Sequence, residues 1–306
     1  MVVLTMDAVD LIWFNGEMKK WSECNTHVLT HSLHYGMGVF EGIRAYETDK
    51  GAAIFRLAEH TERLFKSAEI IGMETTYDVD TFMKATREVI KQNNLKSGYI
   101  RPLFYHGYGK MGLDTTGAQI DALIAAWPWG AYLGEDGKKN GISLKVSKYT
   151  RHFPVENLNQ SKATGFYINS TMAKMDALNT GYNEALMLDL EGNVAECSGE
   201  NIFMVKDKVL VTPNPKNCLN GITRKSIIEI AMDNDIKVEE RIISKDELMN
   251  ADEIFLTGTA AELTPVNKVS DKQFGVGETT LFLQQKYDAI IHGKDEKYLK
   301  WLDFVE

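Results

Sequence analysis

Three short segments of the chain carry the side chains with the most specific chemistry. Lys162 lies on a connection of small and polar residues, Glu196 lies further along the chain, and Gly221–Arg224 precedes a stretch of helical periodicity. A lysine amine can form an imine, a carboxylate can keep a pyridine nitrogen protonated, and the start of a helix can bind a phosphate. These are the three groups with which a protein binds pyridoxal phosphate (PLP), so the pattern predicts amino-group chemistry.

Neighbouring residues add to this interpretation. Tyr167 could donate its phenol to the cofactor's ring oxygen, and Arg63 could make a charge-assisted contact with the phosphate. The turn from Thr257 to Glu262 could form a second backbone anion site. Three small residues after the lysine leave room for a planar cofactor: Ala163, Thr164 and Gly165.

Each feature also has an ordinary explanation when taken alone. A single lysine or glutamate is usually a solvated charge, and Gly221 could simply begin a helix. The spacing of His27, His31 and His34 invites a metal site, but no clear helix puts them on one face and no Cys or Asp cluster joins them. The glycines of residues 36–42 miss the dinucleotide-binding fingerprint by one residue. We therefore expect no metal and no dinucleotide.

Composition limits the function classes further. The chain has 306 residues, of which 44% are hydrophobic and 25% charged, as in ordinary globular proteins. The net charge of −9 argues against nucleic-acid or membrane-surface binding, which would need a basic patch. No apolar run could span a bilayer, and residues 1–10 lack a secretory signal. Three widely spaced cysteines fit a reducing cytoplasm.

The first half of the chain must position part of this chemistry. Leu11–Phe14 and Met18–Trp21 read as a hairpin across Asn15-Gly16. A second strand is expected over residues 35–46, pairing with residues 52–56, and further strands over 99–106 and 118–128. Apolar periodicity predicts helices over 57–71 and 79–93. This half is therefore α+β.

A change of composition near residue 130 predicts a domain boundary. At about 150 residues per domain, the length favours two domains: a small domain over residues 1–130, an interdomain loop over 131–140, and a large domain over 141–306. In the second half we expect strands over 142–149, 184–189, 201–206, 209–212, 237–243 and 253–257, and helices over 168–180, 223–234 and 278–292. Ser244 and Glu247 predict a capped helix start.

Seven segments together resemble the fold-type IV PLP enzymes, and the chain is most similar to bacterial branched-chain amino-acid aminotransferases over nearly its whole length. The resemblance implies a small α/β N-terminal domain and a larger C-terminal domain with a β-barrel-like sheet core. The segments are Ile12–Met18, His34–Arg44, Tyr99–Leu103, Pro128–Gly134, Ser198–Phe203, Gly221–Arg224 and Gly258–Glu262.

The resemblance also implies roles for individual residues. Lys162 is the imine lysine and proton shuttle, Glu196 pairs with the pyridine nitrogen, and Tyr167 pairs with the ring oxygen. Leu219 packs under the ring, and the phosphate is held by Arg63, Gly221, Ile222, Thr223 and Thr259. The substrate α-carboxylate meets the backbone amides of Thr259 and Ala260.

The substrate pocket implied by the resemblance accepts two kinds of side chain. Arg101 binds the distal carboxylate of glutamate, while an apolar wall receives valine, leucine or isoleucine. Residues implied for substrate binding, some from a partner subunit, are Tyr35, Phe40, Gly42, Arg44, Tyr99, Leu113, Trp129 and Tyr132. The implied partners are amino acids and 2-oxo acids, and the implied assembly is a homodimer or a hexamer made of dimers.

Departures from the family pattern are small. Residues 163–166 differ from the commoner Ala-Gly-Gly-Asn, Cys197 stands where glycine is common, and Asn220 where proline is common. The loop from Gly109 to Gly117 corresponds to the family's variable interdomain lid. The expected reaction transfers the amino group of a branched-chain L-amino acid to 2-oxoglutarate. A D-amino-acid transaminase, an aminodeoxychorismate lyase and a non-catalytic PLP-binding protein are the alternatives.

Overall fold

The computed structural model describes residues 7–130, 132–151, 157–216 and 218–305. Residues 1–6, part of the segment predicted to lack a secretory signal, lie outside this range, as does Ala131, the first residue of the predicted interdomain loop. The chain forms two compact units. Unit 1 comprises residues 1–130, 161–166 and 290–306, and unit 2 comprises residues 131–160 and 167–289. The predicted large domain had included residues 161–166 and 290–306, which belong to unit 1.

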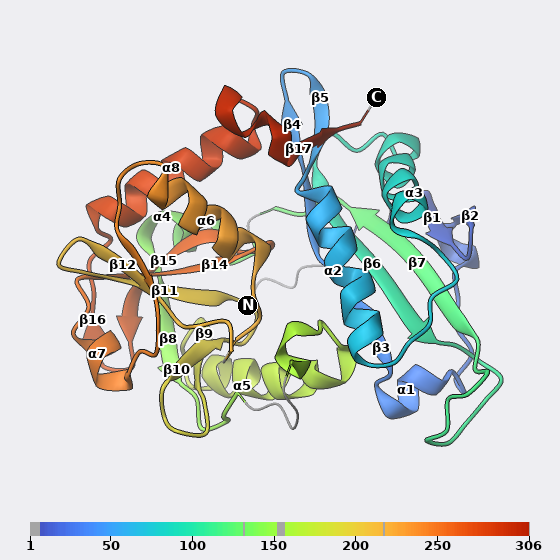
Figure 1. Ribbon diagram of the computed structural model, residues 1–306, viewed down its shortest axis with the longest axis horizontal. Coiled ribbons are helices and arrows are strands. Elements are labelled where there is room, and N and C mark those ends of the chain that lie inside the picture. Colours follow the sequence, from blue (N-terminus) through green and yellow to red (C-terminus); the bar gives the residue numbers. More distant parts are fainter. Residues whose placement is uncertain (1–6, 131, 152–156, 217, 306) are drawn as a thin grey trace. The chain divides into compact units, whose positions relative to one another are not determined.

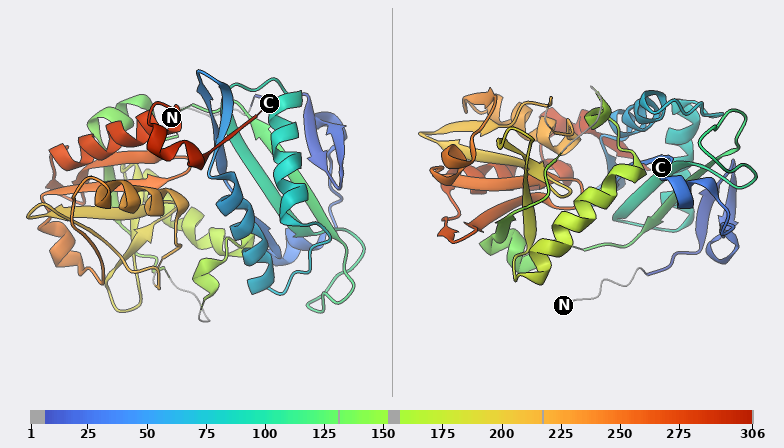
Figure 2. Two further views of the ribbon diagram at one scale, coloured as in Figure 1. Left: turned by 45° about the horizontal axis from the view of Figure 1, so that its top comes forward. Right: turned by 90° about the horizontal axis from the view of Figure 1, so that it is seen from below.

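Unit 1 is a sheet with two long helices on one face, α2 (Leu57–Ile70) and α3 (Val79–Gln92), which lie side by side (Figures 1 and 2). The strand order is β17-β5-β4-β6-β7-β1-β2, with β3 paired to β6. The strands are β1 (Leu11–Phe14), β2 (Glu17–Lys20), β3 (Gly38–Phe40), β4 (Ile43–Thr48), β5 (Gly51–Phe55), β6 (Gly98–His106), β7 (Ile120–Trp127) and β17 (Leu302–Phe304). The shorter helices are α1 (His31–Tyr35), η1 (Trp21–Glu23), η3 (Thr164–Phe166) and η4 (Glu296–Trp301).

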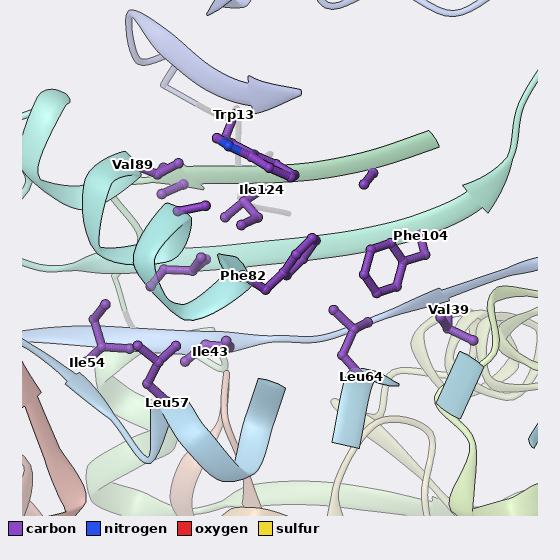
Figure 3. Packing of buried hydrophobic residues seen from close by; sticks show 14 of the residues in the cluster. Trp13, Val39, Ile43, Ile54, Leu57, Leu64, Phe82, Val89, Phe104 and Ile124 are labelled. Carbon is purple, nitrogen blue, oxygen red and sulfur yellow. The ribbon is translucent and has the colours of Figure 1, made fainter. Parts of the chain in front are cut away.

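The core of unit 1 fills the space between its sheet and the two helices. Phe82 of α3 lies against Trp13 of β1 and Phe104 of β6, with ring centroids 5.2 Å and 4.6 Å apart (Figure 3). Leu64 of α2 is fully buried in the same cluster. The periodic apolar residues that predicted these helices are the ones that pack here, which confirms both helices.

One predicted strand of unit 1 is wrong. Residues 35–46 form the end of α1, then β3, then β4, instead of one continuous strand. The break falls at Glu41 and Gly42, and a Cβ atom on Gly42 would lie 2.0 Å from the Tyr99 hydroxyl oxygen. Glycine therefore leaves room for the Tyr99 side chain, and the contact depends on a residue far away in the sequence.

Unit 2 contains a mixed sheet in the order β10-β9-β8-β15-β14-β11-β12-β13, with β16 paired to β15. Its strands are β8 (Ile142–Val146), β9 (Glu184–Leu188), β10 (Val194–Cys197), β11 (Asn201–Lys206), β12 (Val209–Thr212), β13 (Val238–Glu240), β14 (Glu253–Gly258), β15 (Glu262–Val269) and β16 (Lys272–Gln273). Its helices are α4 (Glu135–Asn140), η2 (Leu158–Gln160), α5 (Tyr167–Asn179), α6 (Ile222–Met232), α7 (Lys245–Met249) and most of α8 (Glu278–Ile291).

Local signals explain several of these elements. The Ser244 hydroxyl oxygen accepts a hydrogen bond from the Glu247 backbone N–H, so the predicted cap of α7 is confirmed. The predicted interdomain loop is partly wrong, because residues 135–140 form α4. Strands β10 and β15 were not predicted, and Glu196 lies within β10.

Candidate active site

The backbone of Lys162 is fixed within unit 1 by bonds on both sides. Its N–H donates to the Ser67 hydroxyl oxygen at 3.0 Å, and its carbonyl accepts from the Phe40 N–H at 3.1 Å. Val39 and Ala163 form a β-bridge beside it. The Lys162 amine lies 4.8 Å from the centre of the Phe40 ring. An amine on a fixed backbone and over an aromatic face is suited to chemistry with a planar ligand.

The small residues after Lys162 serve close packing. Ala163 is buried in the core of unit 1, and the Thr164 hydroxyl donates to the Gly36 carbonyl at 2.7 Å. The Gly165 N–H donates to the same carbonyl at 3.1 Å. Their small size therefore lets the lysine segment lie against residues 36–40, a reason that the sequence analysis did not foresee.

Arg63 lies in an ionic cluster on α2. Its Nε and Nη2 atoms donate to the two carboxylate oxygens of Glu41 at 2.6 Å and 2.9 Å, and His60 Nδ1 lies 2.7 Å from one of those oxygens. Burial alone would raise the pKa of the Glu41 carboxyl, but the Arg63 charge and the His60 hydrogen bond lower it far below its usual range. Burial lowers the pKa of His60, although Glu41 opposes this. Neither Glu41 nor His60 was among the predicted site residues.

Arg101 is held between two aromatic rings on β6. Its guanidinium carbon lies 4.6 Å from the Phe40 ring centre and 5.4 Å from that of Tyr99, and Nη2 donates to the Tyr99 hydroxyl at 3.2 Å. Its Nε atom is buried and has no hydrogen-bond partner among the described residues. A guanidinium with a spare buried donor suits a ligand carboxylate.

The other unit 1 residues predicted for substrate binding fall into two groups. Trp129 lies edge-on to Tyr99, with ring centroids 4.5 Å apart, and its carbonyl accepts from Arg44 Nη2 at 2.7 Å. Tyr35 and Leu113, in contrast, are 41% and 87% exposed. Unit 1 thus gathers Lys162 and Arg101 around one ring, Phe40, with Tyr99, Gly42 and Trp129 next to it.

Glu196 is buried in unit 2 with both carboxylate oxygens held. Arg151 Nε donates to one oxygen at 2.7 Å, while the Leu219 N–H and Asn201 Nδ2 donate to the other at 3.1 Å and 3.3 Å. Arg151 itself donates to the Ser170 hydroxyl at 2.9 Å. These bonds fix the direction of the carboxylate, which is what a partner for a ring nitrogen requires. Arg151 was also missed by the sequence analysis.

The start of α6 fits an anionic group. Gly221 precedes the helix without a side-chain cap, and a Cβ atom there would lie 2.1 Å from Asn201 Oδ1. Asn201 is paired across β11 and β14 with Thr257, whose buried hydroxyl has no hydrogen-bond partner among the described residues. Uncapped N–H groups, the helix dipole and a spare hydroxyl together suit a phosphate. Ile222 and Thr223 are the first buried residues of this helix.

The remaining predicted residues of unit 2 lie on turns and helix starts. Thr259 and Ala260 lie in the tight turn between β14 and β15. Tyr167 is the half-buried first residue of α5, and the Tyr132 ring lies 5.6 Å from the Lys174 amine. Unit 2 thus brings Glu196, Leu219 and Gly221 together.

The described residues contain no group of three or more His, Cys, Asp or Glu side chains that could hold a metal ion. His31 and His34 lie on α1, which the sequence analysis did not predict; His31 Nε2 lies 2.9 Å from the Gly112 carbonyl, and His34 Nε2 lies 2.9 Å from that of Val28. None of the helices in the described ranges has both the length and the apolarity to cross a bilayer.

The chain is similar to known aminotransferases along nearly its whole length. The family model for class IV amino-transferases matches residues 38–269. A branched-chain-amino-acid aminotransferase of Pseudomonas aeruginosa is 47% identical over 98% of this chain and 99% of its own length. The crystal structure of the Escherichia coli branched-chain amino acid aminotransferase superimposes with a TM-score of 0.95 at 43% identity, covering 98% of this chain and all of that chain.

A further similar structure was solved as a complex. It is a branched-chain amino acid aminotransferase from T.th., complexed with N-(5'-phosphopyridoxyl)-L-glutamate. Its TM-score is 0.92 at 42% identity, covering 97% of this chain and 99% of that chain. These similarities confirm the predicted fold class, a two-domain fold-type IV architecture.

Proposed function

Because the chain belongs to the class IV aminotransferase family, we propose that it is a branched-chain-amino-acid aminotransferase. It transfers the amino group of L-leucine, L-isoleucine or L-valine reversibly to 2-oxoglutarate, giving the branched 2-oxo acid and L-glutamate. The observation that carries this proposal is the near-complete, 47% identical match to an enzyme of that name.

PLP is the cofactor of this reaction, and when bound it accepts the electrons released at the substrate α-carbon. Lys162 holds the cofactor and carries the α-proton as base and then as acid. Its fixed backbone and its place over the Phe40 ring orient the amine for this task. Glu196, with both oxygens held by hydrogen bonds, keeps the ring nitrogen protonated, and Tyr167 binds the ring oxygen.

One cation and several backbone donors bind the phosphate in this proposal. Arg63 contributes the charge, and the start of α6 contributes the N–H groups of Ile222 and Thr223 after Gly221. Thr259 adds a further contact, and Leu219 packs under the ring. The Thr257 hydroxyl, which has no hydrogen-bond partner within the described ranges, is an additional candidate ligand that was not among the predicted site residues.

The substrate pocket combines an apolar wall with one cation. Phe40, Tyr99 and Trp129 supply aromatic surface in unit 1, and the spare donor of Arg101 receives the distal carboxylate of glutamate. The further pocket residues we propose are Tyr35, Gly42, Arg44, Leu113 and Tyr132, with the backbone amides of Thr259 and Ala260 for the α-carboxylate.

We propose that the enzyme is a homodimer or a hexamer made of dimers. Apolar side chains lie exposed on two segments, around α1 (Val28, Leu33 and Leu113) and along α5 (Ile168, Met172 and Met175). Exposed apolar patches of this kind are typical of subunit interfaces, and would also bring Tyr35 and Leu113 into a partner's pocket. The free thiols of Cys24, Cys197 and Cys218 fit a cytoplasmic location.

The proposal is tested by the absorbance of the purified protein with PLP, before and after addition of L-leucine, with D-alanine in parallel. We expect a bound-PLP band that L-leucine converts and D-alanine leaves unchanged. Conversion by D-alanine alone would indicate a D-amino-acid transaminase, and a band that neither substrate changes would favour the lyase. Lys162→Ala should reduce leucine turnover at least about a hundredfold. Full activity of that variant would refute the role of Lys162.

A further inference from the structure

Glu41 is a fully buried carboxylate for which the proposed reaction has no direct use. Its side chain is 0% exposed, and it lies between β3 and β4. It accepts two hydrogen bonds from Arg63, one from His60, and a longer one of 3.3 Å from the Gly42 N–H. The carboxylate is therefore saturated with donors that belong to two different elements, the β3–β4 connection and α2.

The ionic balance of this cluster explains why Glu41 controls Arg63. Glu41 is ionised because its pKa is lowered by Arg63 and His60, while His60 stays neutral because burial lowers its own pKa. His60 must then carry its proton on Nδ1, where it donates to the carboxylate. Arg63 is thus the single full positive charge opposite Glu41 in this trio, and two of its nitrogens are held in a bidentate pair that fixes the guanidinium plane.

The segment that contains Glu41, Val39–Gly42, also holds Lys162. The Phe40 N–H donates to the Lys162 carbonyl, Val39 is bridged to Ala163, and the Phe40 ring lies 4.8 Å from the lysine amine. Adjacent residues of one segment, Val39–Gly42, therefore hold the lysine on one side and the arginine on the other. All of these contacts lie within unit 1.

We propose that Glu41 is a positioning residue for cofactor binding, acting through Arg63. Glu41 fixes the position and plane of the Arg63 guanidinium. The Val39–Gly42 segment therefore holds this guanidinium and the Lys162 amine at fixed positions relative to each other before the phosphate and aldehyde groups of the cofactor bind. This rests on the proposed roles of Arg63 and Lys162. Stability alone explains the cluster poorly, since buried ion pairs are often no more stabilising than apolar side chains of similar volume.

The test compares two ligands that differ only by the phosphate. PLP and pyridoxal are titrated into the apoprotein and binding is followed by tryptophan fluorescence, for the wild type and for Glu41→Gln. We expect Glu41→Gln to weaken PLP binding about tenfold or more, by analogy with other outer partners of ligand-binding residues. Binding of pyridoxal should change less than twofold. An equal loss for both ligands would overturn the proposal, because it would indicate a general loss of structure.

Two further variants keep the test decisive. Asp303→Asn removes another bidentate arginine–carboxylate pair of unit 1, that of Arg87, and should leave both affinities unchanged. If Glu41→Gln does not fold, Glu41→Asp retains the charge but shifts the guanidinium, and should weaken PLP binding selectively.

A double-mutant comparison separates this proposal from the proposed function. If Glu41 acts through Arg63, adding Glu41→Gln to Arg63→Lys should weaken PLP binding no further. A wild type that binds PLP, with Arg63→Lys weakened and both Glu41 variants normal, would refute the positioning role alone. A wild type that binds no PLP would refute the proposed function itself.

Discussion

Each unit buries a cluster of ionisable side chains, and the two clusters differ in the number of acids for each cation. The Glu41 cluster of unit 1 contains Glu41, His60 and Arg63. The Glu200 cluster of unit 2 contains two acids and one base, Lys174, Glu184 and Glu200. Burial and Glu184 raise the pKa of the Glu200 carboxyl to about 8, whereas the pKa of Glu41 is far below its usual range. At similar burial, the charge of the neighbours decides which carboxyl ionises.

This difference bears on the proposed cofactor site. An ionised Glu41 can orient a cation, as the positioning role requires. Glu200 is four residues from Glu196, and the Glu196 charge contributes to its raised pKa. A neutral Glu200 therefore avoids placing a further negative charge near the carboxylate proposed to bind the ring nitrogen.

The largest expected effect comes from breaking the Glu41 cluster. Glu41→Ala leaves the Arg63 charge and the His60 ring facing a cavity, so we expect the free energy of unfolding to fall by about 3–5 kcal/mol. Urea denaturation of the apoprotein measures this. Glu59→Ala removes a half-exposed partner of Arg56 on the same helix and should cost less than about 1 kcal/mol. Similar losses for the two variants would contradict the comparison.

A smaller loss is expected from the Glu200 cluster. Lys174→Met removes the amine that binds Glu184, but the Ser198 hydroxyl and the Ala185 N–H still donate to that carboxylate. We expect a loss of about 3 kcal/mol or less at pH 8. At pH 5 it should shrink, because acids without a cation beside them take up protons. Denaturation at both pH values measures it, and a loss that grew at pH 5 would show that the charge balance is misassigned.

The sequence predicted the elements of unit 1 better than its ionic contacts. Apolar periodicity identified α2 and α3, and the hairpin signal identified β1 and β2, displaced by one residue at the second strand. The partners of Glu41 could not be predicted, because Arg63 is 22 residues away and burial depends on the packed fold. Glu41 appears in the sequence only as one charge in a glycine-rich stretch.

In unit 2, one strand that carries a proposed site residue was not predicted from the sequence. Residues 194–197 were not predicted to form a strand, although the polar residues Glu196 and Cys197 are both buried in β10. The roles proposed for Lys162 and Glu196 came from residue type and family resemblance. Ser67, which accepts a hydrogen bond from the Lys162 N–H, and Arg151, which donates one to Glu196, carry no local sequence signal of such a role.

Glu200→Gln should remove a pH dependence from unit 2. With a pKa of 4.5 when unfolded and about 8 when folded, Glu200 retains a proton in the folded state that the unfolded chain has lost. Its contribution to stability is therefore full below pH 4.5 and declines as the pH rises towards 8. We expect Glu200→Gln to match the wild type near pH 5 and to be more stable than it at pH 9 by more than about 1.4 kcal/mol, the value of a single unit of pKa shift. Parallel stability curves across this range would contradict the raised pKa.

The smallest expected effect concerns the stability of unit 1 at acid pH. His106 is 3% exposed, neither ring nitrogen has a partner among the described residues, and burial, with His31 second, lowers its pKa below 6.5. Below pH 6.5 the unfolded chain binds a proton that the folded chain resists, so the wild type should lose about 1 kcal/mol between pH 7 and pH 5 from this residue. His106→Phe keeps a ring of similar size without the titration.

His106→Phe should therefore lose less stability than the wild type between pH 7 and pH 5, as measured by thermal denaturation of the apoprotein at each pH. Acid would then destabilise unit 1 through His106, while alkali destabilises unit 2 through Glu200. An equal acid sensitivity of His106→Phe and the wild type would mean that His106 is not held neutral, and the contrast between the units would rest on their carboxylates alone.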